Sequence, residues 1–220
     1  SNAEEFGEWL GEVRGETHVI LSEHRPIPLY QHILINSSLI DLFSSPGKVN
    51  PEIMAAEREA MRKAKVPRNR REQWGVQESR LSRPEIIEKL QRENLLPAIT
   101  FIFSRMGCDA AVKQCLAAGI KLTNTEERAE ILKTAERYTA NLAEEDLEVL
   151  GYRDWITALE RGVAAHHAGL LPSFKNAIED LFQRGLVKAV FATETLALGI
   201  NMPARTVVLE KLTKWNGEAH

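Results

Sequence analysis

Three short polar segments of the sequence carry residue types that bind phosphate groups. Ser104 and Arg105 follow an apolar run of residues, and so do the segments His166 to Gly169 and Thr193 to Thr195. Hydroxyl groups, guanidinium groups and the free backbone amides at the start of a helix are the groups with which proteins hold phosphates. A row of three such turns favours a nucleic-acid backbone as the ligand.

Each segment also has a plain structural explanation when it is taken alone. Ser104 is a typical helix cap, and Thr193 is a typical residue at the end of a strand. His166 and His167 fit the pattern of one buried and one exposed histidine. The alignment of the three segments, rather than any one of them, is what favours a binding site.

The apolar runs before these segments predict the strands that position them. Four short runs have the composition of strands buried in a sheet, and they lie at 97–103, 162–166, 189–192 and 205–209. Helical patterns follow the first two runs and end at Gly119 and Gly185. Right-handed crossovers make such a sheet parallel, and ligands then bind at the carboxyl ends of its strands. The sequence therefore predicts an α/β fold with a parallel sheet flanked by helices.

Two further regions do not follow this pattern. Residues 44–82 lose apolar periodicity and interleave basic residues with glutamates, which is compatible with a phosphate-binding arm or with a solvated linker. The composition favours a charged, flexible linker. Residues 123–161 predict a helical insertion beside the sheet, opened by a capping box of Thr123 and Glu126. A similar pair, Ser82 and Glu85, marks the start of the main domain at 83.

Composition narrows the class of protein. The chain has 220 residues, of which 44% are hydrophobic and 27% charged, as in a soluble globular domain with appendages. A net charge of −3 argues against coating of nucleic acid through a broad positive field. No apolar run is long enough to span a bilayer, and no signal peptide is visible. Cys108 and Cys115, two helical turns apart, predict core thiols of a cytoplasmic protein rather than a disulfide.

Residues 191–204, Phe-Ala-Thr-Glu-Thr-Leu-Ala-Leu-Gly-Ile-Asn-Met-Pro-Ala, closely resemble motif V of superfamily 2 DExH-box helicases of the superkiller and exosome-associated RNA helicase branch. His-His-Ala-Gly-Leu-Leu-Pro at 166–172 and Phe-Ile-Phe-Ser-Arg at 101–105 resemble motifs IVa and IV of that branch. Residues 25–29 resemble its interdomain connector, and 214–217 resemble the segment after motif Va. The sequence is most similar to the actinobacterial HelY type, over nearly the whole chain and in the same order.

The resemblance implies a RecA-like domain of the P-loop NTPase type. Residues 1–43 would hold the end of the first RecA-like domain and the interdomain connector, with Ser1 to Ala3 matching either native sequence or an expression tag. Residues 44–82 would form the linker, and 83–220 a C-terminally truncated second RecA-like domain with the insertion 123–161. The resemblance implies nucleic-acid contacts at Ser104, Arg105, His167, Gly169 and Thr193. It also implies that Gly199 and Asn201 lie at the ATP cleft and that Glu194 couples this cleft to the nucleic-acid site.

Departures from the family pattern limit what this segment is expected to do alone. A Walker A sequence is missing, because Gly47-Lys48 is followed by Val49 and lacks the upstream glycine spacing. The DExH box and motif VI, which carries the arginine finger, are missing as well. No catalytic residue is therefore expected here, and the segment should not hydrolyse ATP alone. No metal site is expected either, because the six histidines and two cysteines never fall into a ligand spacing. ATP and Mg²⁺ are expected only in the full-length enzyme.

The favoured function is the nucleic-acid-binding half of an ATP-dependent helicase, with RNA as the favoured substrate. Its expected partners are an RNA or DNA strand and the first RecA-like domain of the same chain, with no membrane. Two alternatives stay open. One is a non-enzymatic scaffold that binds nucleic acid, which a parent sequence lacking Walker A and a DExH box would favour. The other is a DNA helicase of the same superfamily, because turns that contact phosphates do not sense the 2′-hydroxyl.

Overall fold

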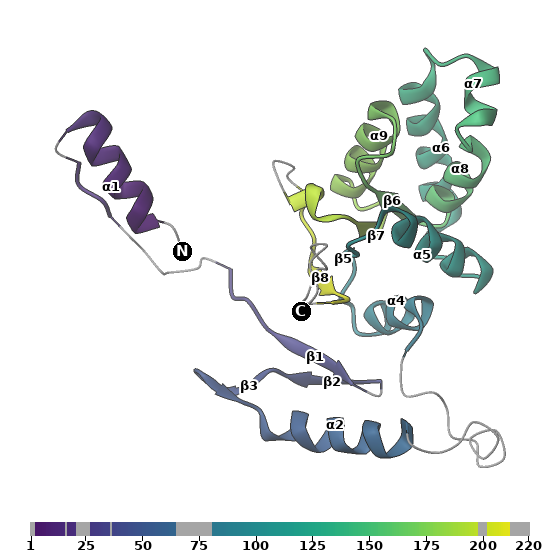
Figure 1. The fold of residues 1–220 in the computed structure, drawn as a ribbon. Coiled ribbons are helices and arrows are strands. Elements are labelled where there is room, and N and C mark those ends of the chain that lie inside the picture. Colours follow the sequence, from purple (N-terminus) through teal and green to yellow (C-terminus); the bar gives the residue numbers. More distant parts are fainter. Residues whose placement is uncertain are drawn as a thin grey trace, which may run out of the picture. The chain divides into compact units, whose positions relative to one another are not determined.

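A computed structural model of the chain describes residues 3–15, 17–20, 27–35, 37–64, 81–197 and 202–211. The chain forms two compact units, Ser1–Arg80 and Leu81–His220 (Figure 1). The boundary between them lies within three residues of the start predicted for the main domain at 83. Each unit has its own secondary structure and is described separately.

The described residues of the first unit form two helices and two short antiparallel hairpins. Its elements are α1 (Ala3–Arg14), β1 (His32–Ile35), β2 (Ser38–Asp41), β3 (Phe43–Ser45), β4 (Lys48–Val49) and α2 (Pro51–Ala64). β1 pairs with β2 and β3 pairs with β4. Ile53 of α2 is buried, and this helix packs against β1.

Part of the segment 44–82, which the sequence predicts as a flexible linker, has regular secondary structure, because β3, β4 and α2 occupy 43–64. A helix start was overlooked there: the side chain of Asn50 accepts a hydrogen bond from the backbone N–H of Glu52, and Pro51 occupies the first helical position. Asparagine at the cap and proline at the first position are start signals even in a charged segment. Residues 65–80 lie outside the described residues.

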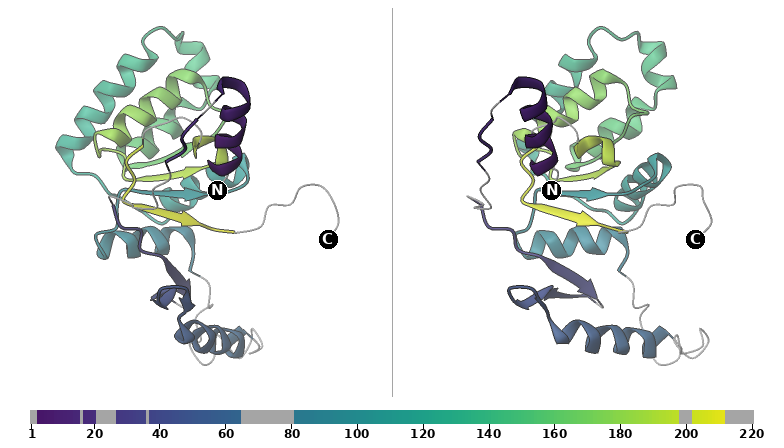
Figure 2. Two further views of the ribbon diagram at one scale, coloured as in Figure 1. Left: turned by 90° about the vertical axis from the view of Figure 1, so that its left-hand side faces the viewer. Right: turned by 60° about the vertical axis from the view of Figure 1, so that its left-hand side comes forward.

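The second unit is built on a four-stranded parallel sheet. Its strands are β5 (Ala98–Phe101), β6 (Val163–His166), β7 (Ala189–Ala192) and β8 (Thr206–Leu209), in the order β6–β7–β5–β8. Figure 2 shows these strands running in one direction. The predicted α/β fold with a parallel sheet is therefore confirmed, and each of the four predicted runs contains a strand.

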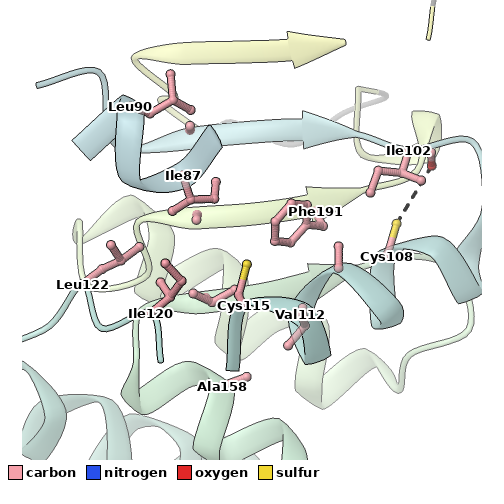
Figure 3. Close-up of a cluster of buried hydrophobic side chains, with 14 residues drawn as sticks. Ile87, Leu90, Ile102, Cys108, Val112, Cys115, Ile120, Leu122, Ala158 and Phe191 are labelled. Carbon is pink, nitrogen blue, oxygen red and sulfur yellow. Dashed lines mark hydrogen bonds between the residues drawn. The ribbon is translucent and has the colours of Figure 1, made fainter. Parts of the chain in front are cut away.

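Helices cover both faces of this sheet. They are α4 (Arg83–Arg92), α5 (Arg105–Ala117), α6 (Thr125–Thr139), α7 (Glu144–Val149), α8 (Tyr152–Glu160) and α9 (Pro172–Gln183), followed by the 3₁₀ turn η1 (Glu194–Ala197). Side chains of α4 and α5 pack around Ala189 and Phe191 in one core cluster (Figure 3). Side chains of α6 and α9 pack around Val190 and Ala192 in the other. Alternate residues of β7 thus serve opposite faces, as a strand buried on both sides requires.

The predicted insertion is helical, and charged side chains attach it to α9 and to the residue before β7. Glu127 of α6 pairs with Lys188 at 2.7 Å and Arg137 pairs with Asp180 at 2.7 Å. Arg184 adds a contact to Glu130 at 2.5 Å between these two pairs. The helix begins one residue later than predicted, because Asn124 rather than Thr123 forms the capping box, with Glu127 as its partner. Thr123 instead donates its hydroxyl to the Glu160 carbonyl, which explains why it is buried.

Candidate nucleic-acid interface

The three polar segments meet at one edge of the sheet because three strands end level. Ala192 of β7 is the register partner of both Phe101 in β5 and His166 in β6. The pairing continues past the strand ends: Ile102 N–H donates to the Ala192 carbonyl at 2.8 Å, and Thr193 N–H donates to the His166 carbonyl at 3.2 Å. The prediction that these turns share the carboxyl edge is therefore confirmed.

Ser104 and Arg105 open helix α5 at this edge. The hydroxyl oxygen of Ser104 accepts a hydrogen bond from the Gly107 N–H at 3.1 Å, so Ser104 is the N-cap. Arg105 is the first helical residue and is exposed, and within the described part of the chain its guanidinium has no recorded hydrogen bond or ion pair. The structure thus confirms the capping role of Ser104 and leaves the cation of Arg105 available at the positive end of a helix.

Gly107 lets α5 begin close to the end of β5. A methyl group added at Gly107 would lie 2.8 Å from Cγ2 of Ile102 and 3.2 Å from Cβ of Ser104. Both neighbours are fixed, Ile102 by the core and Ser104 by its capping bond. The helix start therefore stays tight against the sheet edge.

His167 lies inside the protein rather than on its surface. The residue is 5% exposed, and its Nε2 lies 3.0 Å from Oδ1 of Asp109 on α5. Its Nδ1 accepts a hydrogen bond from the Gly169 N–H at 3.1 Å. Because Nδ1 accepts, Nε2 carries the proton and donates it to the Asp109 carboxylate. Neither ring nitrogen of His167 is free, and neither is the Gly169 amide.

His166 is buried as well, at 4% exposure, so the expected pattern of one buried and one exposed histidine is wrong. Its Nε2 lies 2.8 Å from Oε1 of Glu179 on α9, which attaches the end of β6 to that helix. Nδ1 of His166 is buried and has no hydrogen-bond partner among the residues that the structure describes. The neutral ring with its proton on Nε2 fits these contacts, since it leaves no buried N–H unsatisfied. The adjacent histidines therefore fix the strand end from two sides.

Thr193 and Glu194 follow β7 at the same edge. The hydroxyl groups of Thr193 and Thr195 lie 2.9 Å apart, and Thr193 is half-buried while Glu194 begins η1 and is exposed. Leu196 N–H donates to the Thr193 carbonyl at 3.1 Å, which closes the 3₁₀ turn. Gly199 and Asn201, the other predicted positions of this loop, lie outside the described residues.

A hollow of about 300 Å³ adjoins the start of α5 and was not predicted. Its lining includes two aromatic rings, the Ser104 cap and three charged residues: Arg83, Phe101, Ile102, Phe103, Ser104, Gly107, Glu210 and Lys211. Arg83 and Glu210 form a two-pronged ion pair across it, with N–O distances of 3.1 and 3.0 Å. These two residues are 127 positions apart in sequence, so no local pattern signals their contact.

Other kinds of site find less support. The described residues contain no cluster of three or more His, Cys, Asp or Glu side chains that could hold a metal ion. Within the same residues, no helix is long and apolar enough to cross a membrane.

Comparison with known proteins identifies close relatives. No family model matches the chain. The chain is 53% identical to a protein named probable helicase HelY from Mycobacterium leprae, and this match covers 100% of the chain and 25% of that protein. It is 37% identical to the DExH-box ATP-dependent RNA helicase DExH15 of Arabidopsis thaliana, over 99% of the chain and 21% of the relative. It is 34% identical to human Superkiller complex protein 2, over 98% of the chain and 18% of the relative.

The chain thus spans about a quarter or less of the length of these curated relatives. The matches cover nearly all of the chain, including the parallel sheet and the three turns at its edge. They agree with the resemblance found in motifs IV, IVa and V. The chain belongs to the DExH-box helicase family of the HelY and superkiller type.

Proposed function

We propose that the carboxyl edge of this sheet binds one strand of nucleic acid in an ATP-dependent helicase. One observation carries the proposal: β5, β6 and β7 end level and present three polar turns side by side. Successive phosphates of a single strand present a row of negative charges, which a row of such turns can follow. The names of the relatives, which are helicases, support the same activity for the full-length protein.

Each contact has a distinct role in this proposal. Arg105 supplies a cation beside the strand, and Ser104 supplies its hydroxyl together with the amides at the start of α5. Thr193 supplies a second hydroxyl from the end of the neighbouring strand β7, between the other two turns. The turn from His167 to Gly169 forms the third part of the surface. Because backbone phosphates are alike, these contacts bind without reading sequence.

The proposal gives the loop after β7 a coupling role in the full-length protein. Glu194, Gly199 and Asn201 would face the nucleotide between this domain and a first RecA-like domain. The described residues offer no cluster of carboxylates for Mg²⁺, so the metal ligands and the phosphate-transfer machinery would come from elsewhere in the protein. When bound there, ATP supplies the energy that changes the distance between the two domains. This segment alone would bind a strand without hydrolysing ATP.

The proposed domain assignment follows the family pattern. Residues 1–43 would contain the end of the first RecA-like domain and the connector, and 83–220 would contain the second domain. The compact unit Leu81–His220, which holds the parallel sheet and the insertion, supports the latter assignment.

RNA is the proposed substrate. Two relatives from Arabidopsis, 37% and 32% identical to this chain, are named RNA helicases. Unwinding of matched RNA and DNA duplexes with 3′ single-stranded tails by the full-length protein tests this choice. Preference for the RNA duplex is the expected result, and preference for the DNA duplex would contradict it.

The coupling role has its own test in the full-length protein. Thr193→Ala is expected to lower both ATP hydrolysis stimulated by RNA and duplex unwinding. Undiminished rates in both assays would contradict the role given to this loop. Absence of ATP hydrolysis by the wild-type protein under all conditions would instead favour a non-enzymatic binding scaffold.

A further inference from the structure

The side chain of His167 joins two of the three turns at the sheet edge. His167 follows β6, and its Nε2 reaches Asp109 in the second turn of α5, while its Nδ1 holds the Gly169 amide two residues further on. Gly169 also lies beside the arginine that opens α5. A methyl group at Gly169 would be 3.1 Å from His167 Nδ1 and 3.7 Å from Cδ of Arg105. The ring thus fills the space between the two turns.

Burial prevents this ring from acting as an ordinary surface ligand. Its side chain is 6% exposed, whereas that of Asp109 is 50% exposed. Both ring nitrogens already have hydrogen-bond partners within the protein. A strand at the edge would therefore meet Arg105 and the backbone of the turn, with the imidazole behind them.

We infer that Asp109 and His167 are positioning residues that fix the spacing between Arg105 and the turn at Gly169. This inference rests on the proposed function and extends it to Asp109, which lies outside the three predicted contact segments. Two phosphate-binding groups act together on one strand only when their spacing matches that of the phosphates. A hydrogen-bonded histidine with one partner on each side holds that spacing with two bonds.

The charge of Asp109 separates this role from a direct electrostatic one. A carboxylate near a phosphate-binding edge repels the strand, so its negative charge does not favour binding. Its value to the site lies in an oxygen that accepts the proton of Nε2. Asparagine offers the same oxygen without the charge. We call the two hydrogen bonds of His167, one to Asp109 and one from the Gly169 amide, the clamp. Asp109→Asn therefore keeps the clamp, whereas Asp109→Ala breaks its bond to α5.

Substitutions of His167 divide the clamp into its two halves. His167→Asn places an amide oxygen near the position of Nδ1, which keeps the bond to the Gly169 amide and loses the bond to Asp109. His167→Gln places an amide group near Nε2, which keeps the bond to Asp109 and loses the bond to Gly169. If the clamp acts as a unit, each of these variants is weakened.

The decisive experiment measures the full-length protein with a uridine homopolymer. Asp109→Ala, His167→Asn and His167→Gln are expected to raise the concentration of RNA needed for half-maximal ATP hydrolysis by about tenfold, with kcat at saturating RNA retained. Asp109→Asn keeps the acceptor and removes the repulsive charge, so it is expected to need no more RNA than the wild type. Asp154→Ala, an exposed aspartate on α8 in the insertion, is the matched control and is expected to change nothing.

The outcomes distinguish failure of the clamp from failure of the proposed function. If the wild type does not bind the homopolymer, the proposed function fails. If Arg105→Ala weakens binding but Asp109→Ala and both His167 variants bind as tightly as the wild type, the clamp fails and the proposed function stands. Equal weakening by Asp109→Asn and Asp109→Ala would also overturn it, because the charge rather than the acceptor would then matter.

A measurement on the wild type keeps the inference testable should a variant not fold. Nitrogen NMR of the imidazole is expected to show His167 as the neutral ring protonated on Nε2, with a slowly exchanging Gly169 amide. A ring protonated on Nδ1, or a Gly169 amide that exchanges as fast as an open loop, would overturn it.

Discussion

Phe101 and Ala192 are direct partners in the parallel pairing of β5 and β7, so these two strands end at the same level. The backbone bond from Ile102 N–H to the Ala192 carbonyl extends the match by one residue. The chain then diverges into α5 on one side and η1 on the other. A shift of the register by one residue would move one turn by about 3.3 Å along the strand direction, out of line with the other turn, and would point its side chains to the other face.

The N-cap at Ser104 gives the first prediction. Ser104→Ala removes the acceptor for the Gly107 N–H and is expected to lower the free energy of unfolding by about 1 kcal/mol, measured by urea denaturation of the chain. Ser104→Asp keeps a capping oxygen and should retain most of the stability, yet it places a carboxylate where a phosphate is proposed to bind. It is therefore expected to weaken strand binding more than Ser104→Ala does. The opposite order of binding would contradict a phosphate at this position.

Close packing at Gly169 gives the second prediction. Gly169→Ala brings a methyl group to 3.1 Å from His167 Nδ1 and is expected to destabilise the chain by about 1–2 kcal/mol. In a His167→Ala background the ring is gone, so the same substitution should cost nothing further. Urea denaturation of the wild type, both single variants and the double variant measures this coupling. Additive losses would show that the two residues do not contact each other as described.

The ion pair between Lys188 and Glu127 gives the third prediction, because it attaches the insertion to the sheet. Lys188 Nζ donates to Glu127 at 2.7 Å and to the Leu122 carbonyl at 2.9 Å. Its replacement by methionine is expected to cost about 2 kcal/mol of unfolding free energy at neutral pH. Lys113→Met, an exposed lysine on α5, is the matched control, and an equal loss there would contradict a specific role for Lys188.

The pH dependence of that loss follows from the carboxyl group of Glu127. Burial acts to raise its pKa, but the hydrogen bond and charge of Lys188 and the Asn124 backbone N–H outweigh burial and lower it below its usual 4.5. A carboxyl group whose pKa is lowered by folding stabilises the protein above its unfolded pKa, and this contribution is lost as the pH falls through the folded pKa. The difference between wild type and Lys188→Met should therefore shrink below about pH 4.5. A difference that grows in acid would contradict the pair.

The two cysteines give the fourth prediction. Burial raises the pKa of both the Cys108 and the Cys115 thiol to about 11, and both residues lie on α5 with their side chains in the core (Figure 3). Because the thiolate is the reactive form, a thiol-specific reagent at pH 8 is expected to label neither cysteine in the folded chain and both in denaturant. Rapid labelling of the folded chain would contradict their burial.

Much of the second unit was predictable because its signals are local. Buried strands were visible as continuous apolar runs, and Gly119 has the left-handed backbone, φ 77°, expected after the end of α5. Long-range contacts left no such signal: nothing near His167 in the sequence points to Asp109, which is 58 residues away. The adjacency of two histidines does not reveal whether their rings are buried, so the sequence does not show that both His166 and His167 lie inside the protein.

Salt-dependent binding of RNA by Arg105→Ala in the full-length protein tests the central claim most directly. One lost phosphate contact should weaken binding and reduce the slope of log affinity against log salt concentration by about 0.7 for a single strand. The control is Arg92→Ala. Arg92 is an exposed arginine at the end of α4, and the chain after α4 leads into the opposite edge of the sheet, so this substitution should leave affinity and slope unchanged. An unchanged slope for Arg105→Ala, or an equal reduction for both variants, would contradict strand binding at the carboxyl edge.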